Sequence, residues 1–184
     1  SFIDNKANGS FINSTKNGTE LNHFSVTKSS FKNTISNGLF YVVSDSINIE
    51  KSEISGSSNG YVDLNGYKKA VLSECYIHDN EHLYMHYNGY GSNTFTYLKE
   101  NTIANNINVG SGLGYLLDFT SNADSVVFTN NTFVSNNDGN LINFTGCRPY
   151  MYNNTIVGNV NESYLISSHP GNLVLKGNII LGNN

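Results

Sequence analysis

VVFTNNTFVSN, residues Val126 to Asn136, contains a pattern that occurs seven times in the chain of 184 residues. Two apolar residues stand two apart, a small or amide residue follows, and Phe or Ile comes two positions later, usually with Asn three further on. The Phe or Ile anchors are Phe31, Ile54, Ile77, Ile103, Phe133, Ile156 and Ile180, at spacings of 23, 23, 26, 30, 23 and 24 residues. The position five before each anchor is apolar in every copy. Such a period is typical of repeat architectures.

Each repeat also holds a second apolar stretch after a turn, as in Asn59-Gly60 before Tyr61–Leu64. About three short strand-like segments per repeat result, and none is long enough for a helix with an apolar stripe. Short strands bury their apolar side when equivalent strands stack ~4.8 Å apart. Repeats of unequal length and the preference for right-handed crossovers favour a right-handed coil. We therefore predict an all-β, right-handed, single-stranded parallel β-helix: one domain over residues 1–184, with about seven coils of ~23 residues.

A leucine-rich horseshoe is the alternative fold, because its repeats share the order apolar-x-apolar-x-x-Asn/Cys-x-apolar. That family usually has a further Leu three positions before the first apolar residue. Only Leu21 satisfies this rule among the seven copies.

Asparagine is the commonest residue, with 32 copies, and four of them occupy the slot two before an anchor. A side-chain amide is both donor and acceptor, so stacked Asn residues can hydrogen-bond along the axis of a solenoid. We expect Asn101, Asn131, Asn154 and Asn178 to form such a ladder, with the smaller Ser29, Ser52 and Cys75 in the same slot at one end. This placement predicts a small buried Cys75, not bridged to Cys147.

Composition argues against several classes of partner. The net charge is −4 and no cluster of Lys or Arg occurs, so nucleic acid is not expected. No apolar run approaches the ~20 residues of a membrane helix, so this segment should not insert into a membrane. The two cysteines make no metal motif, and we expect neither a metal nor a cofactor.

The phrases Val127–Asn137 (VFTNNTFVSNN) and Met151–Asn159 (MYNNTIVGN) resemble those of large Asn-rich, adhesin-like surface proteins of microbes. They are also similar to the repeats of polymorphic outer-membrane protein passenger domains, which carry Phe-x-x-Asn. The resemblance implies an extracellular or cell-surface rod that is one piece of a longer repeat-containing chain. It further implies host or microbial surface glycans or proteins as partners.

One polar constellation stands out if the second apolar stretches align between coils. The residues Asp63, His86, Asp118 and Asn143 would then point outward and stack ~5 Å apart, a spacing compatible with a divalent metal or an acid–base pair. A solvated polar column is the plain alternative.

Tyrosines are dense beside this column, with seven of twelve inside 37 residues: Tyr61, Tyr67, Tyr76, Tyr84, Tyr87, Tyr90 and Tyr97. Exposed rings stack on sugars and anchor interfaces, whereas buried ones would simply fill the core. The candidate ligand-binding residues are therefore Tyr61, Asp63, Tyr84, His86, Tyr87 and Asp118, and none is assigned as catalytic.

Three functions remain open from the sequence. The leading hypothesis is a non-enzymatic, adhesin-like module that displays a binding face. The second is a carbohydrate-active enzyme using Asp63, His86 and Asp118; the paired Asp residues and Arg-x-Lys of polygalacturonase-like sites are missing, since the single Arg148 precedes Pro149. The third is a spacer that binds nothing.

Overall fold

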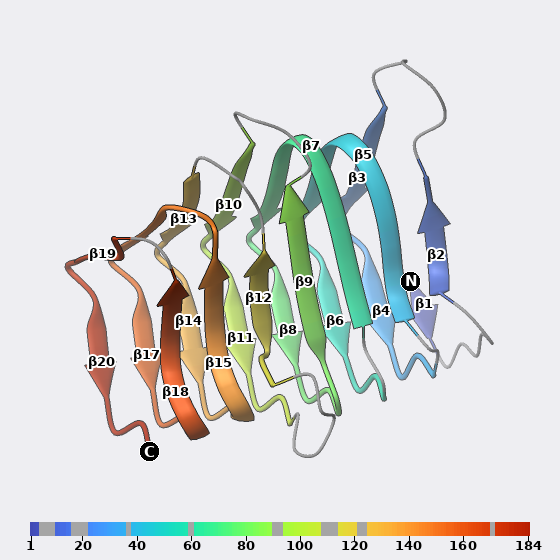
Figure 1. Cartoon of the computed structure of the whole chain (residues 1–184). Helices are drawn as coiled ribbons and strands as arrows, with labels where there is room; N and C mark the ends of the chain where they lie inside the picture. Colours follow the sequence, from blue (N-terminus) through green and yellow to red (C-terminus); the bar gives the residue numbers. More distant parts are fainter. Residues whose placement is uncertain are drawn as a thin grey trace.

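A computed structural model describes residues 1–3, 10–15, 22–35, 38–58, 61–89, 94–107, 114–120, 125–169 and 172–184. These residues form twenty β-strands and contain no helix, which excludes the leucine-rich horseshoe. All paired strands are parallel, and the chain winds into a right-handed solenoid of about six turns, close to the seven predicted. Figure 1 shows the coils stacked side by side, with the N-terminus at one end of the rod and the C-terminus at the other.

The first face of the solenoid is an eight-stranded sheet of short strands that contain the anchors. In spatial order its strands are β1 (Phe2–Ile3), β4 (Ser30–Lys32), β6 (Glu53–Ser55), β8 (Tyr76–His78), β11 (Thr102–Ala104), β14 (Thr132–Val134), β17 (Thr155–Val157) and β20 (Ile179–Leu181).

The second and third faces belong to one twelve-stranded sheet, because β5 (Gly38–Glu50) and β7 (Tyr61–Ser73) bend and continue from one face to the next (Figure 1). Besides the first halves of β5 and β7, the second face contains β2 (Ser10–Ser14), β9 (Tyr84–Gly89), β12 (Leu117–Thr120), β15 (Asn137–Thr145) and β18 (Val160–His169). Besides their second halves, the third face contains β3 (His23–Thr27), β10 (Phe95–Lys99), β13 (Ser125–Thr129), β16 (Pro149–Tyr152) and β19 (Val174–Lys176). Each coil thus has the three segments that the sequence predicts.

Two corners of each coil place a residue in the left-handed region, where φ is positive. Between the third and first faces these residues are Lys28, Lys51, Glu74, Glu100, Asn130, Asn153 and Gly177, and after the first face they are Asn33, Gly56, Asp79, Asn105, Ser135, Gly158 and Gly182. A single left-handed residue reverses the local curvature and turns the strand sharply. The residue that follows each one points into the coil.

These inward residues form two ladders. In the predicted ladder, the Asn131 amide donates to Leu98 O (2.8 Å) and to Asn154 Oδ1 (2.9 Å), and its own Oδ1 accepts from the backbone and side-chain N–H of Asn101. Cys75 occupies its slot, buried and free, with its N–H donating to Asn101 Oδ1 (3.0 Å). The sequence prediction of this ladder is confirmed.

A second ladder runs along the other corner and was not predicted. Its members are Asn80, Asn106, Asn136, Asn159 and Asn183, and each of the first four donates its side-chain N–H to Oδ1 of the next at 2.9 Å. The recurring Asn three after each anchor was its visible signal.

The core is filled by the anchors and by the apolar residues of the other two faces. Phe31, Ile54, Ile77, Ile103, Phe133 and Ile156 are at most 1% exposed. Phe119, Phe128 and Phe144 pack together, with ring centroids 5.3 to 5.5 Å apart. The repeated apolar positions therefore become continuous stacks inside the rod.

Candidate functional site

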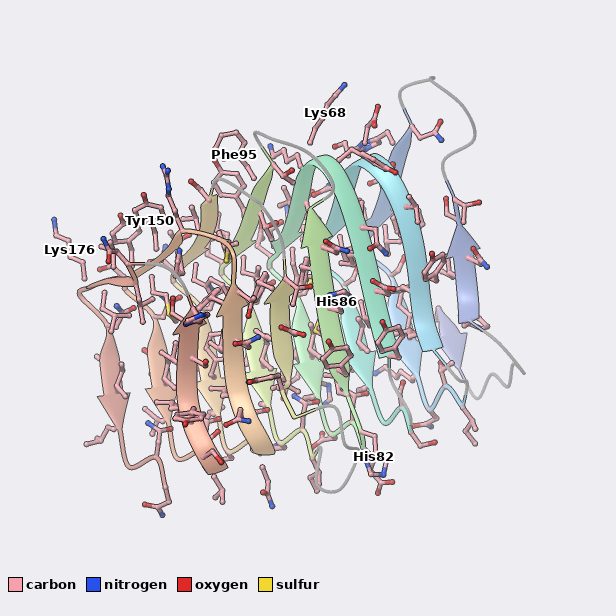
Figure 2. The ribbon with its side chains drawn as sticks, viewed as in Figure 1. Lys68, His82, His86, Phe95, Tyr150 and Lys176 are labelled. Atoms are coloured by element: carbon pink, nitrogen blue, oxygen red, sulfur yellow. The ribbon has the colours of Figure 1, made fainter. Side chains whose placement is uncertain are left out.

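The predicted polar column lies on the second face. Asp63 of β7 is in register with His86 of β9, His86 with Asp118 of β12, and Asp118 with Asn143 of β15. Their neighbours along each strand, such as Val62 and Leu64, are buried in the core. Because side chains alternate along a strand, the column residues point to the outer side, and Figure 2 shows His86 on this face of β9.

Hydrogen bonds tie the column together across coils. His86 Nδ1 lies 3.1 Å from Asp63 Oδ1, and His86 Nε2 lies 2.5 Å from Oγ1 of Thr120. The Asn65 amide donates to Asp63 Oδ1 at 2.9 Å, and the Asn143 amide donates to Asp118 Oδ1 at 2.8 Å. Thr120 and Asn65 were not predicted, because each stands two residues after a column member on the same strand and the prediction considered only the residues of the column itself.

Two tyrosines form an aromatic platform beside the column. The ring of Tyr84 stacks on Tyr61 (centroids 5.3 Å apart) and on His86 (5.9 Å), and its hydroxyl donates to Asp118 Oδ2 at 2.6 Å. Burial, with the nearby charge of Asp63 and a hydrogen bond to it, raises the pKa of Tyr61 to about 12. Burial and Asp118 raise the pKa of Tyr84 well above its usual range. Both phenols therefore stay protonated donors at neutral pH.

The column is more enclosed than a solvated surface would be. Asp63, Asp118 and Tyr84 are 8 to 9% exposed, whereas Tyr61 and His86 are half-buried. Tyr87 lies inside the coil, 2% exposed, with its ring stacked 4.8 Å from Phe119. We therefore remove Tyr87 from the candidate ligand-binding residues, because its neighbours on the strand, not Tyr87 itself, face outward.

The other tyrosines of the predicted dense segment do not make one strip. Tyr76 projects from the first face, where it stacks on His78, and Tyr97 projects from the third face. Tyr90 lies outside the described residues. Tyrosines that are close in the sequence therefore lie on different faces of the coil.

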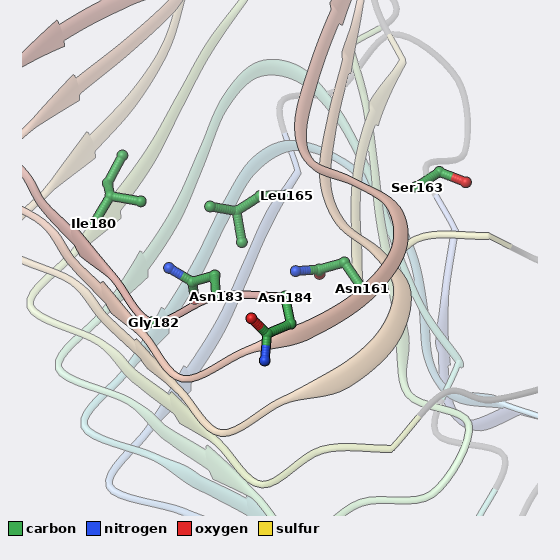
Figure 3. A pocket seen from close by; sticks show the side chains of 7 residues that line it. All are labelled: Asn161, Ser163, Leu165, Ile180, Gly182, Asn183 and Asn184. Carbon is green, nitrogen blue, oxygen red and sulfur yellow. The ribbon is translucent and has the colours of Figure 1, made fainter.

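Surface hollows occur elsewhere than on the polar column. One lies at the C-terminal end of the rod (Figure 3), and its lining residues are Asn161, Ser163, Leu165, Ile180, Gly182, Asn183 and Asn184. Another lies along the corner between the third and first faces, beside Lys28, Lys51 and Glu74. Within the described parts of the chain, no group of three or more His, Cys, Asp or Glu is arranged to hold a metal ion.

Sequence reasoning missed an exposed aromatic surface on the third face. Its rings are the exposed Phe95 and Tyr97 of β10 and the half-buried Tyr150 and Tyr152 of β16. Four cations belong to the same strands or their ends: Lys69 of β7, Lys99 of β10, Arg148 just before β16 and Lys176 of β19. We call these eight residues the aromatic–basic face. Its signal was the alternation Phe-x-Tyr and Tyr-x-Tyr in two distant strands, which only the register between coils brings together.

Comparison with known proteins agrees with this architecture. The model of a family described as a right-handed β-helix region matches residues 8–184. The chain belongs to this family. No curated protein and no solved structure matches the chain in the corresponding searches.

The match to the right-handed β-helix family covers nearly the whole solenoid, but it defines a fold and not a function. Among the described residues, no helix has the length and apolar character needed to cross a lipid bilayer. The function of this β-helix must therefore be argued from its faces.

Proposed function

We propose that this β-helix is a non-enzymatic surface-exposed or secreted module, adhesin-like, that displays a binding face for glycans or proteins of host or microbial surfaces. The observation that carries the proposal is the half-buried ring of Tyr61, which is held by stacking on the buried ring of Tyr84 and lies beside fixed hydrogen-bonding groups on the outer side of the second face. Aromatic rings bind the apolar faces of sugars, and neighbouring polar groups orient their hydroxyls.

Preorganisation further supports a binding role for this face. The two tyrosines of the platform and His86 of the column are each held by a residue from another coil. Tyr61 is held by Tyr84, Tyr84 by Asp118, and His86 by both Asp63 and Thr120. Groups that are already ordered lose little conformational entropy when a ligand arrives. The carboxylate of Asp63 accepts a hydrogen bond from Asn65, and that of Asp118 accepts one from Asn143. Both carboxylates therefore help to hold the face rigid.

A carbohydrate-active enzyme, a hydrolase or lyase, is the second candidate, and one observation favours it. The order carboxylate, imidazole, hydroxyl in Asp63, His86 and Thr120 is that of an activated nucleophile, with the imidazole between its orienting acid and the hydroxyl. In that reading His86 takes the Thr120 proton as Oγ1 attacks an acyl or glycosyl centre, and it returns this proton to the sugar oxygen whose bond to that centre breaks. Water then releases the group from Oγ1. A spacer without a ligand is the third candidate.

One experiment separates the three candidates. The protein is incubated with a panel of acidic and neutral polysaccharides, and both retention and product formation are measured. Retention without new reducing ends or unsaturated products supports the binding module, and Tyr61→Ala should then weaken retention about fivefold if ring stacking contributes ~1 kcal/mol. Turnover that disappears in Thr120→Val or His86→Ala would establish the enzyme. If the protein shows neither retention nor turnover on glycan or protein arrays, the spacer is the candidate that agrees with the result.

A further inference from the structure

The third face of the rod differs from the second in exposure and charge. Along β10 the burial alternates, with Phe95, Tyr97 and Lys99 exposed and the two residues between them buried. The same alternation in β16 turns Tyr150 and Tyr152 outward, with their rings stacked 6.3 Å apart. Figure 2 shows Phe95, Tyr150 and Lys176 projecting from this side of the rod, away from His86.

The register places two of these rings, the exposed Tyr97 and the half-buried Tyr150, in one line along the rod. Val71, Tyr97, Val127, Tyr150 and Val174 are paired in that order on adjacent strands, so they form one outward column. Tyr97 and Tyr150 are two coils apart, which places them ~10 Å from each other along the axis. This spacing is about the length of a disaccharide unit in an extended chain.

Positive charge borders this column. Lys69 Nζ lies 5.7 Å from the ring centre of Tyr97, and Lys99 and Lys176 occupy the outward column on the other side. None of the outward residues of β10, β13, β16 and β19 is acidic, although the whole chain has a net charge of −4. In the described part of the chain, the one carboxylate in an ion pair with these cations is Glu100, 3.4 Å from Lys99.

We propose that the aromatic–basic face binds an anionic polysaccharide that lies along the rod axis. Tyr97 and Tyr150 stack on successive units of the polymer, while Lys69, Arg148 and Lys176 pair with its carboxylate or sulfate groups. The inference rests on the proposed binding function and names a second face and a ligand class for it. A single nucleic-acid strand suits the face less well, because cations spread over five strands of a flat sheet form no continuous phosphate channel.

Affinity electrophoresis of the whole protein in gels that contain hyaluronan, heparin or dextran tests the proposal. Retardation by hyaluronan indicates recognition of carboxylates, and retardation by heparin recognition of sulfates; either supports the proposal. The double variant Tyr97→Ala/Tyr150→Ala should lose binding at least tenfold, because it removes both rings on which the sugar units stack. The double variant Arg148→Ser/Lys176→Ser should bind more weakly and with a smaller dependence on salt.

Matched controls keep the result interpretable. Tyr76→Ala and Tyr164→Ala remove tyrosines that are 45% and 60% exposed on other faces, and Lys68→Ser removes a neighbouring cation that pairs with Asp45. These controls should bind like the unaltered protein, and circular dichroism should show that all variants are folded. Equal losses in controls and test variants would overturn the proposal, as would tighter binding to oligo(dT) or polyglutamate.

Failure of this inference and failure of the proposed function have different signatures. Binding of dextran or of a protein ligand through Tyr61, without binding of hyaluronan or heparin, overturns the inference and leaves the proposed function intact. If the protein binds none of these ligands, both the inference and the proposed function are overturned.

Discussion

A ladder asparagine uses all of its hydrogen-bonding capacity. Asn131 donates twice and accepts twice, and every partner belongs to another coil. Its neighbour Asn130 is exposed at the corner. One residue of a consecutive Asn-Asn pair therefore needs its side chain for the ladder, whereas the other stands at a left-handed corner position that Lys, Glu and Gly occupy in other coils.

Asn131→Asp should destabilise the protein strongly, whereas Asn130→Asp should have little effect. The aspartate keeps both acceptors but loses both donors and adds a buried charge facing Leu98 O and Asn154 Oδ1. We expect a loss of about 3–5 kcal/mol for Asn131→Asp and less than about 0.5 kcal/mol for Asn130→Asp. Urea denaturation of both variants measures the difference. Equal midpoints would contradict the ladder.

The two buried thiols predict loss of stability at alkaline pH. Burial raises the pKa of Cys75 to about 11 and that of Cys147 to about 12. An unfolded thiol ionises near pH ~8.5, so between that pH and the folded value the unfolded chain releases protons that the folded chain retains, and stability falls as pH rises.

The Cys75→Ser/Cys147→Ser variant should show a shallower fall of the urea midpoint between pH 8 and pH 10. Both thiols of the unaltered protein should also resist alkylation at pH 8 until urea unfolds it. Rapid alkylation of the folded protein would disprove the burial of these side chains.

At the scale of an element, the corners decide which residues the strands can tolerate. Gly56 and Gly158 occupy the same corner in different coils, with φ of 62° and 64°. A Cβ on Gly56 would lie 2.3 Å from Asn33 Oδ1, whereas a Cβ on Gly158 would meet only Ser135 Oγ, at 3.9 Å. The side chain of Asn33 therefore fits only because the next coil has glycine above it.

Gly158→Ala should cost about 1–2 kcal/mol from backbone strain alone, and Gly56→Ala should cost more because Asn33 must also move. Adding Asn33→Gly to Gly56→Ala should recover the excess. Thermal unfolding of the two single variants and the double variant gives the comparison, and a double variant no better than Gly56→Ala would refute the contact between coils.

The polar column links four strands of the second face, β7, β9, β12 and β15, by side-chain hydrogen bonds as well as by the backbone. Tyr84→Phe deletes the hydroxyl that donates to Asp118, and we expect a loss of about 1.5–3 kcal/mol, the range for hydrogen bonds to charged groups. Tyr76→Phe, at an exposed position, serves as the control and should change little. If both variants denature at the same urea concentration, the network contributes nothing to stability.

The sequence predicted the strands and coils better than it predicted the surfaces that they form. The phrase around each anchor was enough to predict the coils and the ladder of Asn101, Asn131 and Asn154. The alignment of Asp63 with His86 followed from matching the second apolar stretches of successive repeats. The enclosure of the column depends on packing between coils, which spacing does not encode. Tyr97 and Tyr150 each stand six positions before an anchor, so the phrase aligns them, but it does not encode how far each ring is exposed.

At the scale of the molecule, stacking turns a weak repeat into a rod with separate faces. The first face contributes the anchors, the second the polar column and the third the aromatic–basic face. Both proposed ligand contacts run parallel to the rod axis, so each additional coil lengthens the surface that a polymer can contact. Function on this β-helix therefore depends on the register between coils.

The distance between spin labels along one outward column tests this register most directly. Ser25 and Val174 end the column Ser25, Asn48, Val71, Tyr97, Val127, Tyr150, Val174, which spans six steps between strands. At ~4.8 Å a step, the backbone sites of Ser25 and Val174 should lie ~29 Å apart, and those of Ser25 and Val127 ~19 Å apart. Pulsed electron resonance on the two doubly labelled variants should show this difference of ~10 Å; equal distances, or one broad distribution for both pairs, would contradict the stacked coils.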